Sequence, residues 1–152
     1  MASAQVQLPH NLNAILQEAD LQINNHPVQV EVAKLVKVCW LDVSKKFPSK
    51  NLTPKHNYGV WFVLMKLNEC EGFQNHPVNL KLTLPNQTPM EHKQDLSILP
   101  ENKWSYVPVG VFSTNYGMTG DMEISMYEHG SQWKKGIVVN KIIICPLRPP
   151  RN

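Results

Sequence analysis

Alternating apolar and polar positions dominate the chain from Pro27 onward. In residues 78–84 every second side chain is a valine or a leucine, which is typical of a strand with one buried and one exposed face. Residues 58–67 are instead almost continuously apolar and predict a central strand. Further strands are expected at residues 28–40, 90–99, 103–112, 122–127 and 137–144. The pattern therefore predicts an all-β fold, an antiparallel β-sandwich of seven to nine strands with jelly-roll-like connections.

The alternation is interrupted by a slip near Ala33 and Lys34, within the first of these segments. Val28, Val30 and Val32 alternate with polar residues before the slip, and Val36, Val38 and Trp40 alternate with Lys37 and Cys39 after it. Such a slip has two explanations, a β-bulge that adds a residue to one strand or a break between two consecutive strands. The sequence leaves both explanations open.

The N-terminal region follows a different pattern. Leu12, Ile15 and Leu16 are spaced as on one face of a helix, and the run Asn-Asn-His-Pro that follows would end that helix. A short amphipathic N-terminal helix is expected, covering one edge or pole of the sandwich. We therefore divide a single domain into an N-terminal helical segment, residues 1–26, and a β-sandwich part, residues 27–152.

Composition and charge are those of a soluble globular protein. Hydrophobic residues make up 42% and charged residues 18% of the 152 positions. The formal net charge of +3 is too small to require a nucleic-acid partner. No run approaches the roughly 18 apolar residues of a membrane-spanning helix, so no membrane partner is expected. The first residues, MASAQVQLP, do not resemble a secretory signal peptide, and we expect a cytoplasmic protein.

Residues that carry chemistry in enzymes and metal sites are scattered along the chain. There is no GxSxG, HExxH, GxGxxG or phosphate-loop motif, and the six histidines stand singly. Cys39 or Cys145 could serve as a nucleophile with a distant histidine, but both fall in predicted strands, where a thiol is more often a small buried side chain. With Cys70 the cysteines are odd in number and far apart, which favours free thiols in a reducing compartment. We expect no enzymatic activity, no metal and no cofactor.

Trp133 is the most informative aromatic residue. It lies in a polar connection, residues 128–136, where its own sheet cannot easily bury an indole. Two interpretations remain, a ring that folds back over an edge of the sandwich and a platform for a ligand. A platform would suit a sugar, because the axial C–H face of a β-linked pyranose packs on an indole while its hydroxyls need polar partners at the rim. Ser131, Gln132 and Lys134 supply such groups.

Several segments between residues 34 and 147 carry a resemblance to a known family. They are residues 38–43, 58–63, 77–82, 103–110, 124–128 and 133–139. In this order they resemble the phloem protein 2 family of plant lectins, and most closely its short cucurbit members. The resemblance implies binding of N-acetylglucosamine oligomers (chitin fragments) and of the chitobiose core of N-glycans. It also implies a homodimer in the cytoplasm of phloem sieve elements or companion cells, with a role in plant defence.

The resemblance also implies which residues contact the sugar. Residues 112–133 are similar to the sugar-binding domain of F-box proteins that recognise N-glycan cores, in which a Trp-Lys pair contacts chitobiose. Here that pair would be Trp133 and Lys134, with Gln132 in place of an aromatic residue. An early tryptophan that matters in tobacco-type lectins is matched by Trp40, which could equally be a core residue of its strand. We expect a shallow groove in which Trp133 stacks on one sugar unit. The neighbouring unit would contact Trp40, or else Tyr58 or Phe73. The residues that form hydrogen bonds with the sugar would be Gln132, Lys134 and Asn57.

Two other functions remain open. Basic residues follow Glu128 without an intervening acid, and a second basic stretch spans residues 37–55, so these groups could hold single-stranded RNA. Alternatively, Cys39, Cys70 or Cys145 could form intermolecular disulfides in a structural, filament-forming phloem protein. RNA binding would weaken steeply with salt, whereas stacking of a neutral sugar would not. Titration of native thiols would test the structural alternative.

Overall fold

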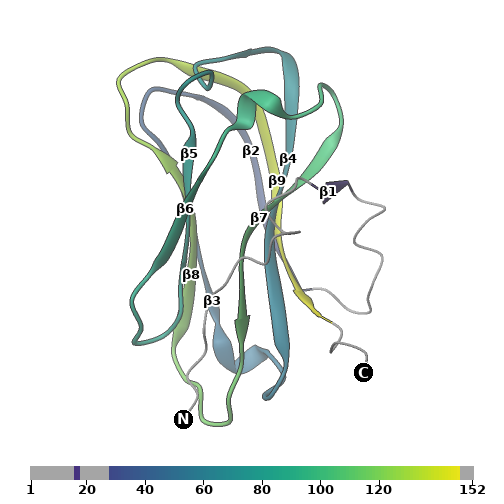
Figure 1. Ribbon diagram of the computed structural model, residues 1–152, viewed down its shortest axis with the longest axis vertical. Coiled ribbons are helices and arrows are strands. Elements are labelled where there is room, and N and C mark those ends of the chain that lie inside the picture. Colours follow the sequence, from purple (N-terminus) through teal and green to yellow (C-terminus); the bar gives the residue numbers. More distant parts are fainter. Residues whose placement is uncertain (1–15, 18–27, 148–152) are drawn as a thin grey trace.

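Two antiparallel sheets face one another in the computed structural model, which describes residues 16–17 and 28–147 (Figure 1). The strands are β1 (Leu16–Gln17), β2 (Val28–Val38), β3 (Leu41–Pro48), β4 (Asn57–Glu71), β5 (Val78–Thr83), β6 (Met90–Gln94), β7 (Trp104–Ser113), β8 (Asp121–Glu128) and β9 (Lys134–Pro146). Two short 3-10 helices, η3 (Ser49–Asn51) and η4 (Leu96–Ile98), lie in connections. No helix in the described part of the chain is long and apolar enough to cross a membrane. The predicted all-β sandwich is confirmed.

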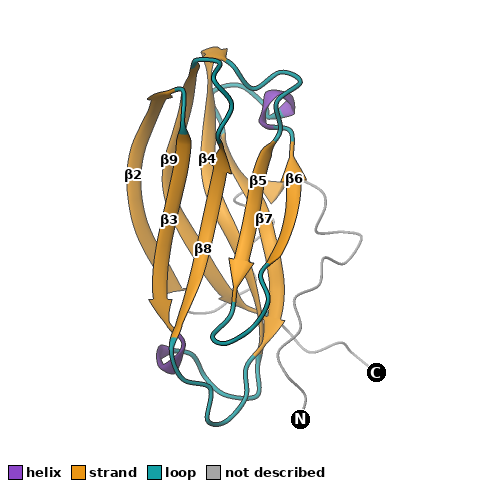
Figure 2. Cartoon of the chain, turned by 90° about the vertical axis from the view of Figure 1, so that its left-hand side faces the viewer, coloured by secondary structure: helices purple, strands orange, loops and turns teal. Residues whose placement is uncertain are grey.

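The strand order is that of a jelly roll. One sheet has the order β1-β7-β4-β9-β2 and the other the order β3-β8-β5-β6. Figure 2 shows β3, β8, β5 and β6 side by side, with the larger sheet behind them. Because most consecutive strands belong to different sheets, the chain crosses between the layers at the two ends of the sandwich. Connections that are far apart in the sequence therefore meet at each end.

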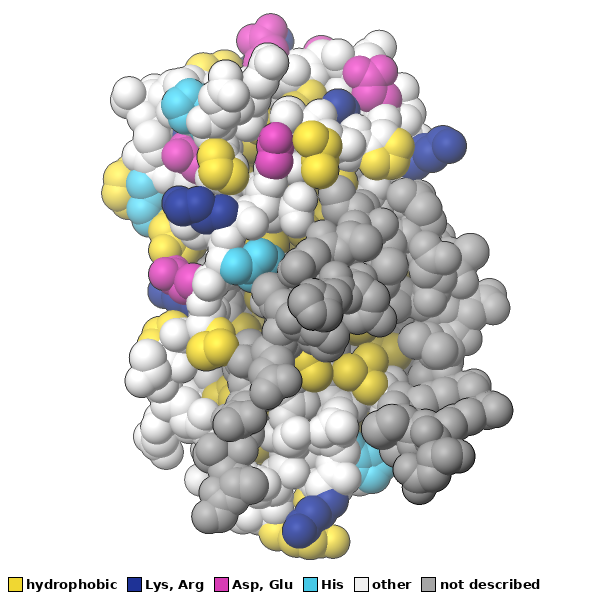
Figure 3. Space-filling view, viewed as in Figure 1, with side chains coloured by type: hydrophobic (Ala, Val, Ile, Leu, Met, Phe, Trp, Pro, Cys, Tyr) yellow, Lys and Arg dark blue, Asp and Glu magenta, His cyan; other side chains and the backbone are white. Residues whose placement is uncertain are grey.

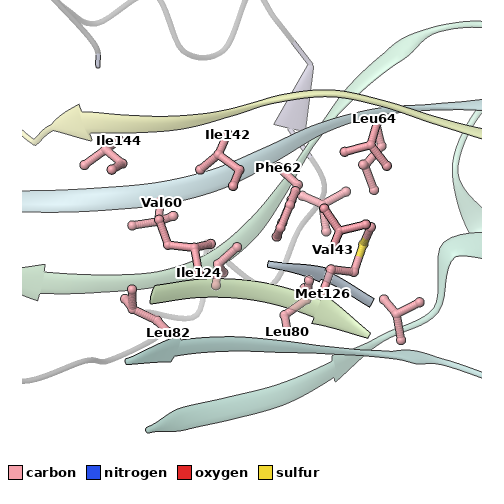
Figure 4. Packing of buried hydrophobic residues seen from close by; sticks show 14 of the residues in the cluster. Val43, Val60, Phe62, Leu64, Leu80, Leu82, Ile124, Met126, Ile142 and Ile144 are labelled. Carbon is pink, nitrogen blue, oxygen red and sulfur yellow. The ribbon is translucent and has the colours of Figure 1, made fainter. Parts of the chain in front are cut away.

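Inward-facing side chains from both sheets form one core (Figure 4). On β4, Val60, Phe62 and Leu64 point inward and are fully buried. They pack toward Leu80 and Leu82 of β5 and the inward residues of β3 and β8 in the other sheet. Removing this apolar surface from water stabilises the fold by about 25 cal/mol for each Å². The core thereby fixes the two sheets against each other and makes their ends a rigid base for the loops.

The slip in β2 is a bulge. The register between β2 and β9 shifts between Glu31 and Lys34, and Ala33 has a φ of 49°. Of the two explanations that the sequence left open, the bulge is confirmed. β2 then ends at Val38, and Cys39 and Trp40 form the turn in which the chain crosses to the other sheet. The expectation that these two residues lie inside a strand is wrong.

Two other expectations differ from the structure or fall outside it. The strand expected over residues 90–99 ends at Gln94, because the carboxylate of Asp95 accepts the backbone N–H of Ser97 at 2.9 Å and caps η4. The expected N-terminal helix and the boundary after residue 26 lie outside the described residues, apart from β1. The two residues of β1 are paired with β7 as strand rather than helix.

Candidate functional site

Three connections meet at the upper end of the sandwich in Figure 1, called the loop end below. They are the β2–β3 turn (residues 39–40), the β4–β5 loop (residues 72–77) and the β8–β9 loop (residues 129–133). Gln132 Nε2 donates to the carbonyl of Gly72 at 3.2 Å, and Lys134 Nζ donates to the carbonyl of Cys39. The β8–β9 loop is therefore tied to both of its neighbours.

Lys134 is the residue that holds the loop end together. Its side chain is 0% exposed, and Nζ lies 2.9 Å from Oε1 of Glu128. The same ammonium donates to the carbonyls of Gly130 at 3.0 Å, of Gln132 at 3.1 Å and of Cys39. A buried charge is tolerated only when it is paired and hydrogen-bonded, and these four oxygens meet that requirement. Lys134 therefore stabilises the β8–β9 loop through contacts of its buried ammonium within the protein. Its expected role was instead to contact a ligand.

Glu128 and Gln132 complete this internal network. Burial raises the pKa of the Glu128 carboxyl, but hydrogen bonds from Lys134, Gln132 and the backbone N–H of Gly130 outweigh burial and hold the pKa below its ordinary value. Gln132 Nε2 donates to Glu128 Oε1 at 2.9 Å as well as to the β4–β5 loop. Gln132, like Lys134, is therefore committed to contacts within the protein.

Trp133 projects from this fixed backbone into solvent. The residue is 49% exposed, although both of its sequence neighbours are held by hydrogen bonds. Its backbone packs closely on the β4–β5 loop, because a Cβ built on Gly72 would lie 2.1 Å from the carbonyl oxygen of Trp133. Gly72 also has a φ of 91°, a conformation that favours glycine. The close approach positions Trp133 while leaving part of its indole uncovered.

Replacing Gly72 with alanine should therefore displace the β8–β9 loop. We expect a loss of about 2–3 kcal/mol in the free energy of unfolding, from the strained φ and from the clash with Trp133. Gly117→Ala is the matched control, since Gly117 has a φ of 80° but no atom within 4 Å of a built Cβ. That control should lose only about 1 kcal/mol. Equal losses in urea denaturation of the two variants would contradict the argument.

Trp40 lies beside this network, one residue after the Cys39 carbonyl that Lys134 binds. It is 64% exposed, so the core role left open by its sequence position is wrong. The imidazole of His129 stacks on the indole, with ring centroids 3.7 Å apart and planes differing by 3°. His129 Nε2 in turn lies 3.2 Å from Oδ2 of Asp42. The loop end therefore carries two exposed indoles, one in each of two linked connections.

The remaining expected site residues lie elsewhere. Phe73 is at the loop end but only 1% exposed, so it belongs to the core. Tyr58 is 4% exposed, and its hydroxyl accepts the backbone N–H of Thr53 at 2.9 Å. Asn57 is exposed and accepts the Ser113 hydroxyl at 2.6 Å. Asn57 and Tyr58 begin β4, whose other end leads into the β4–β5 loop, so roughly 40–45 Å of strand separates them from Trp133.

A groove of about 410 Å³ adjoins the loop end. It is lined by polar side chains that include Asn68, Gln74 and Glu101, together with Gly72 and Phe73 of the β4–β5 loop. Another groove, of about 450 Å³, lies between the β5–β6 loop and the start of β8 and contains none of the expected site residues. Among the described residues, no three His, Cys, Asp or Glu side chains are grouped as metal ligands. The loop end thus offers aromatic faces with amide and carboxylate groups nearby.

Sequence reasoning did not single out the residues that support the two indoles. Glu128, His129 and Asp42 were visible only as polar residues in a loop or on the wet face of a strand. His129 contacts Asp42 and Trp40, which are distant in the sequence, so no local spacing connects these three residues. The only local signal was the run Glu-His-Gly-Ser-Gln-Trp-Lys, in which polar residues of several types surround one indole.

Comparison with known proteins shows which family the sequence matches. The family model Phloem protein 2 matches residues 18–146. The Arabidopsis thaliana protein PHLOEM PROTEIN 2-LIKE A1 is 42% identical over 120 residues, which cover 77% of this chain and 48% of that protein. A protein of Luffa acutangula named lectin is 32% identical over 122 residues, covering 80% of this chain and 57% of its own length. A lectin of Coccinia grandis is 26% identical over 117 residues, which cover 76% of this chain and 74% of that lectin.

The chain spans about half the length of the first of these relatives. The family model nevertheless extends over all of the strands from β2 to β9. The match therefore includes both sheets and all three connections of the loop end. On this basis the chain belongs to the phloem protein 2 family.

Proposed function

We propose that this chain is a lectin that binds N-acetylglucosamine oligomers, as they occur in chitin fragments and in the chitobiose core of N-glycans. The observation that carries the proposal is the pair of exposed indoles, Trp40 and Trp133, on connections that Lys134 joins. Two relatives of the chain are named lectins, which supports the same class of function. The family resemblance supports the particular sugar.

The proposed mechanism is stacking on a preformed surface. The axial C–H face of one pyranose would pack on Trp133, and a neighbouring unit would pack on Trp40. Because Lys134 and Gln132 are engaged inside the loop, other groups must meet the hydroxyls and the acetamide. Candidates are the exposed Ser131 beside Trp133 and the amide of Gln74 in the adjoining groove. No proton transfer or metal is needed for such binding.

A glycan array followed by calorimetry tests this function. Chitobiose and chitotriose should both bind more tightly than N-acetylglucosamine, because two neighbouring units can use both indoles. The affinity for these neutral sugars should change little between about 50 and 200 mM salt. Correctly folded protein that binds neither oligomer would overturn the proposal.

RNA binding is the alternative that the salt series separates. Lys37 lies opposite Lys135 in the β2–β9 register, which brings two cations together. Lys134, however, is buried, and Lys141 Nζ lies 3.3 Å from the side-chain oxygen of Gln29. In the upper part of the face shown in Figure 3, the described lysines lie among acidic side chains. A steep fall in RNA affinity with salt, without sugar binding, would favour this alternative.

The cross-linked structural role depends on reactive thiols. Cys145 is buried, and Cys39 and Cys70 are half-buried. Burial raises the pKa of the thiols of Cys70 and Cys145, which lowers the thiolate fraction that forms disulfides. Slow reaction of native thiols with a thiol reagent would count against the structural role. Disulfide-linked oligomers on a non-reducing gel would support it.

We also propose an oligomeric state, a compartment and a biological role on the basis of the family resemblance. The resemblance supports a homodimer, residence in the cytoplasm of phloem sieve elements or companion cells, and a role in defence. Light scattering on the purified chain would show whether it forms a dimer. Localisation of the tagged protein in plant tissue would test the expected compartment.

A further inference from the structure

The turn that carries Trp40 provides little to hold the indole in one position. It consists of Cys39 and Trp40 alone, and Trp40 is 64% exposed. A side chain without neighbours samples several rotamers, and ordering it on binding weakens affinity. The value of Trp40 as a platform therefore depends on what packs against it.

The imidazole of His129 packs flat on one face of the indole. The ring centroids are 3.7 Å apart and the planes differ by 3°. On β8, the ring of Tyr127 lies 4.8 Å from the same imidazole, at an interplanar angle of 33°. Trp40 thus has one face covered by His129, and its high exposure leaves the opposite face to solvent.

His129 is itself anchored to the four-stranded sheet. Its Nε2 lies 3.2 Å from Oδ2 of Asp42, and Oδ1 of Asp42 accepts the Ser44 hydroxyl at 2.8 Å. Asp42 and Tyr127 are direct partners in the β3–β8 register. A chain of contacts therefore runs from paired strands through His129 to the indole.

We propose that His129 is a positioning residue for saccharide recognition: anchored by Asp42, it holds the Trp40 indole so that the free face meets a sugar ring. This inference rests on the proposed lectin function. The imidazole does not touch the sugar, since it occupies the opposite face of the indole. Its contribution is to remove rotamers of Trp40 before the ligand arrives.

The other charged groups near the imidazole act on its neighbour Tyr127. Lys81 Nζ on β5 lies 5.6 Å from the centroid of the Tyr127 ring. Glu91 on β6 accepts the Tyr127 hydroxyl. Both charges contact Tyr127, whereas Asp42 is the charged group in direct contact with His129.

Two measurements on four proteins test the inference: the wild type, His129→Ala, His129→Phe and the control His56→Ala. His56 is a suitable control because it is an exposed histidine near the opposite end of the sandwich. The first measurement is calorimetry with chitotriose. The second is the NMR order parameter of the Trp40 indole N–H without sugar, which does not depend on any ligand.

His129→Ala should bind chitotriose about three- to tenfold more weakly and should lower the Trp40 order parameter. His129→Phe should restore the affinity, since its ring can still stack. An unchanged order parameter and affinity in His129→Ala would overturn the inference. If His129→Ala fails to fold, a clear loss of sugar affinity in folded His129→Phe would overturn it instead. If the wild type binds no sugar, the lectin proposal fails, while the order parameters still decide whether His129 holds Trp40.

Discussion

Replacing Lys134 with methionine should lower the free energy of unfolding by about 3–5 kcal/mol. Methionine has a similar length but cannot satisfy the Glu128 carboxylate or the carbonyls of Gly130 and Gln132 that the ammonium now binds. The variant leaves the largely buried Glu128 carboxylate without its cation, and an uncompensated buried charge is strongly destabilising. Urea denaturation followed by tyrosine and tryptophan fluorescence measures the loss.

Lys141→Met is the matched control on the same strand. Among the described residues, the Lys141 ammonium reaches only the side-chain oxygen of Gln29, in an exposed contact, so its replacement should change stability by less than about 0.5 kcal/mol. Similar stabilities for both variants would show that Lys134 does not hold the loop end.

The pH dependence of stability gives a second readout of the same network. The pKa of Glu128 is lower in the folded protein than its ordinary value of 4.5. The unfolded state therefore binds more protons, so this stabilisation is complete above about pH 4.5 and is lost as pH falls through the lowered folded pKa. In Lys134→Met the ammonium no longer lowers the pKa of Glu128, whereas burial still raises it. Glu128 should therefore titrate at higher pH in this variant. Carboxyl NMR shifts measured from about pH 3 to 7 would show this change.

Replacing Trp133 with alanine should weaken chitotriose binding by about 2–4 kcal/mol while the fold survives. The indole is 49% exposed and contributes little to the core, so the thermal transition should move only slightly. Stacking on the sugar unit at this position is lost, because residues 129–133 contain no other tryptophan and no tyrosine or phenylalanine. Calorimetry on the folded variant measures the change in affinity.

Tyr116→Ala is the control for Trp133→Ala. Tyr116 is 74% exposed, and Lys55 Nζ lies 5.7 Å from its ring centroid. Its loop follows Ser113, the partner of Asn57, so it lies at the end of the sandwich opposite Trp133. The control should bind chitotriose as the wild type does. Unchanged binding in Trp133→Ala would mean that this indole is a surface residue and that the sugar lies elsewhere.

Local patterns were sufficient for most of the strands. The valine and leucine alternation of residues 78–84 specified β5 with its buried face, and the slip at Ala33 located a bulge without distinguishing it from a break. Strand ends were less accurate, as at Gln94, because a single capping side chain decided where pairing stopped. The exposed character of Trp133 could be anticipated because its surroundings in the sequence are polar.

The sequence by itself determined the β-sandwich, because the period of apolar residues is local and each strand needs one buried face. Only the tertiary structure decided what each candidate side chain does at the loop end. Residues 39–40, 72 and 129–134 meet there because strands of two sheets end together. That meeting buried the Lys134 charge, left Trp40 exposed against His129, and moved Tyr58 and Asn57 to the far end of β4. These roles depend in part on residues distant in the sequence, such as Cys39 for Lys134 and His129 for Trp40, so no local pattern could have assigned them.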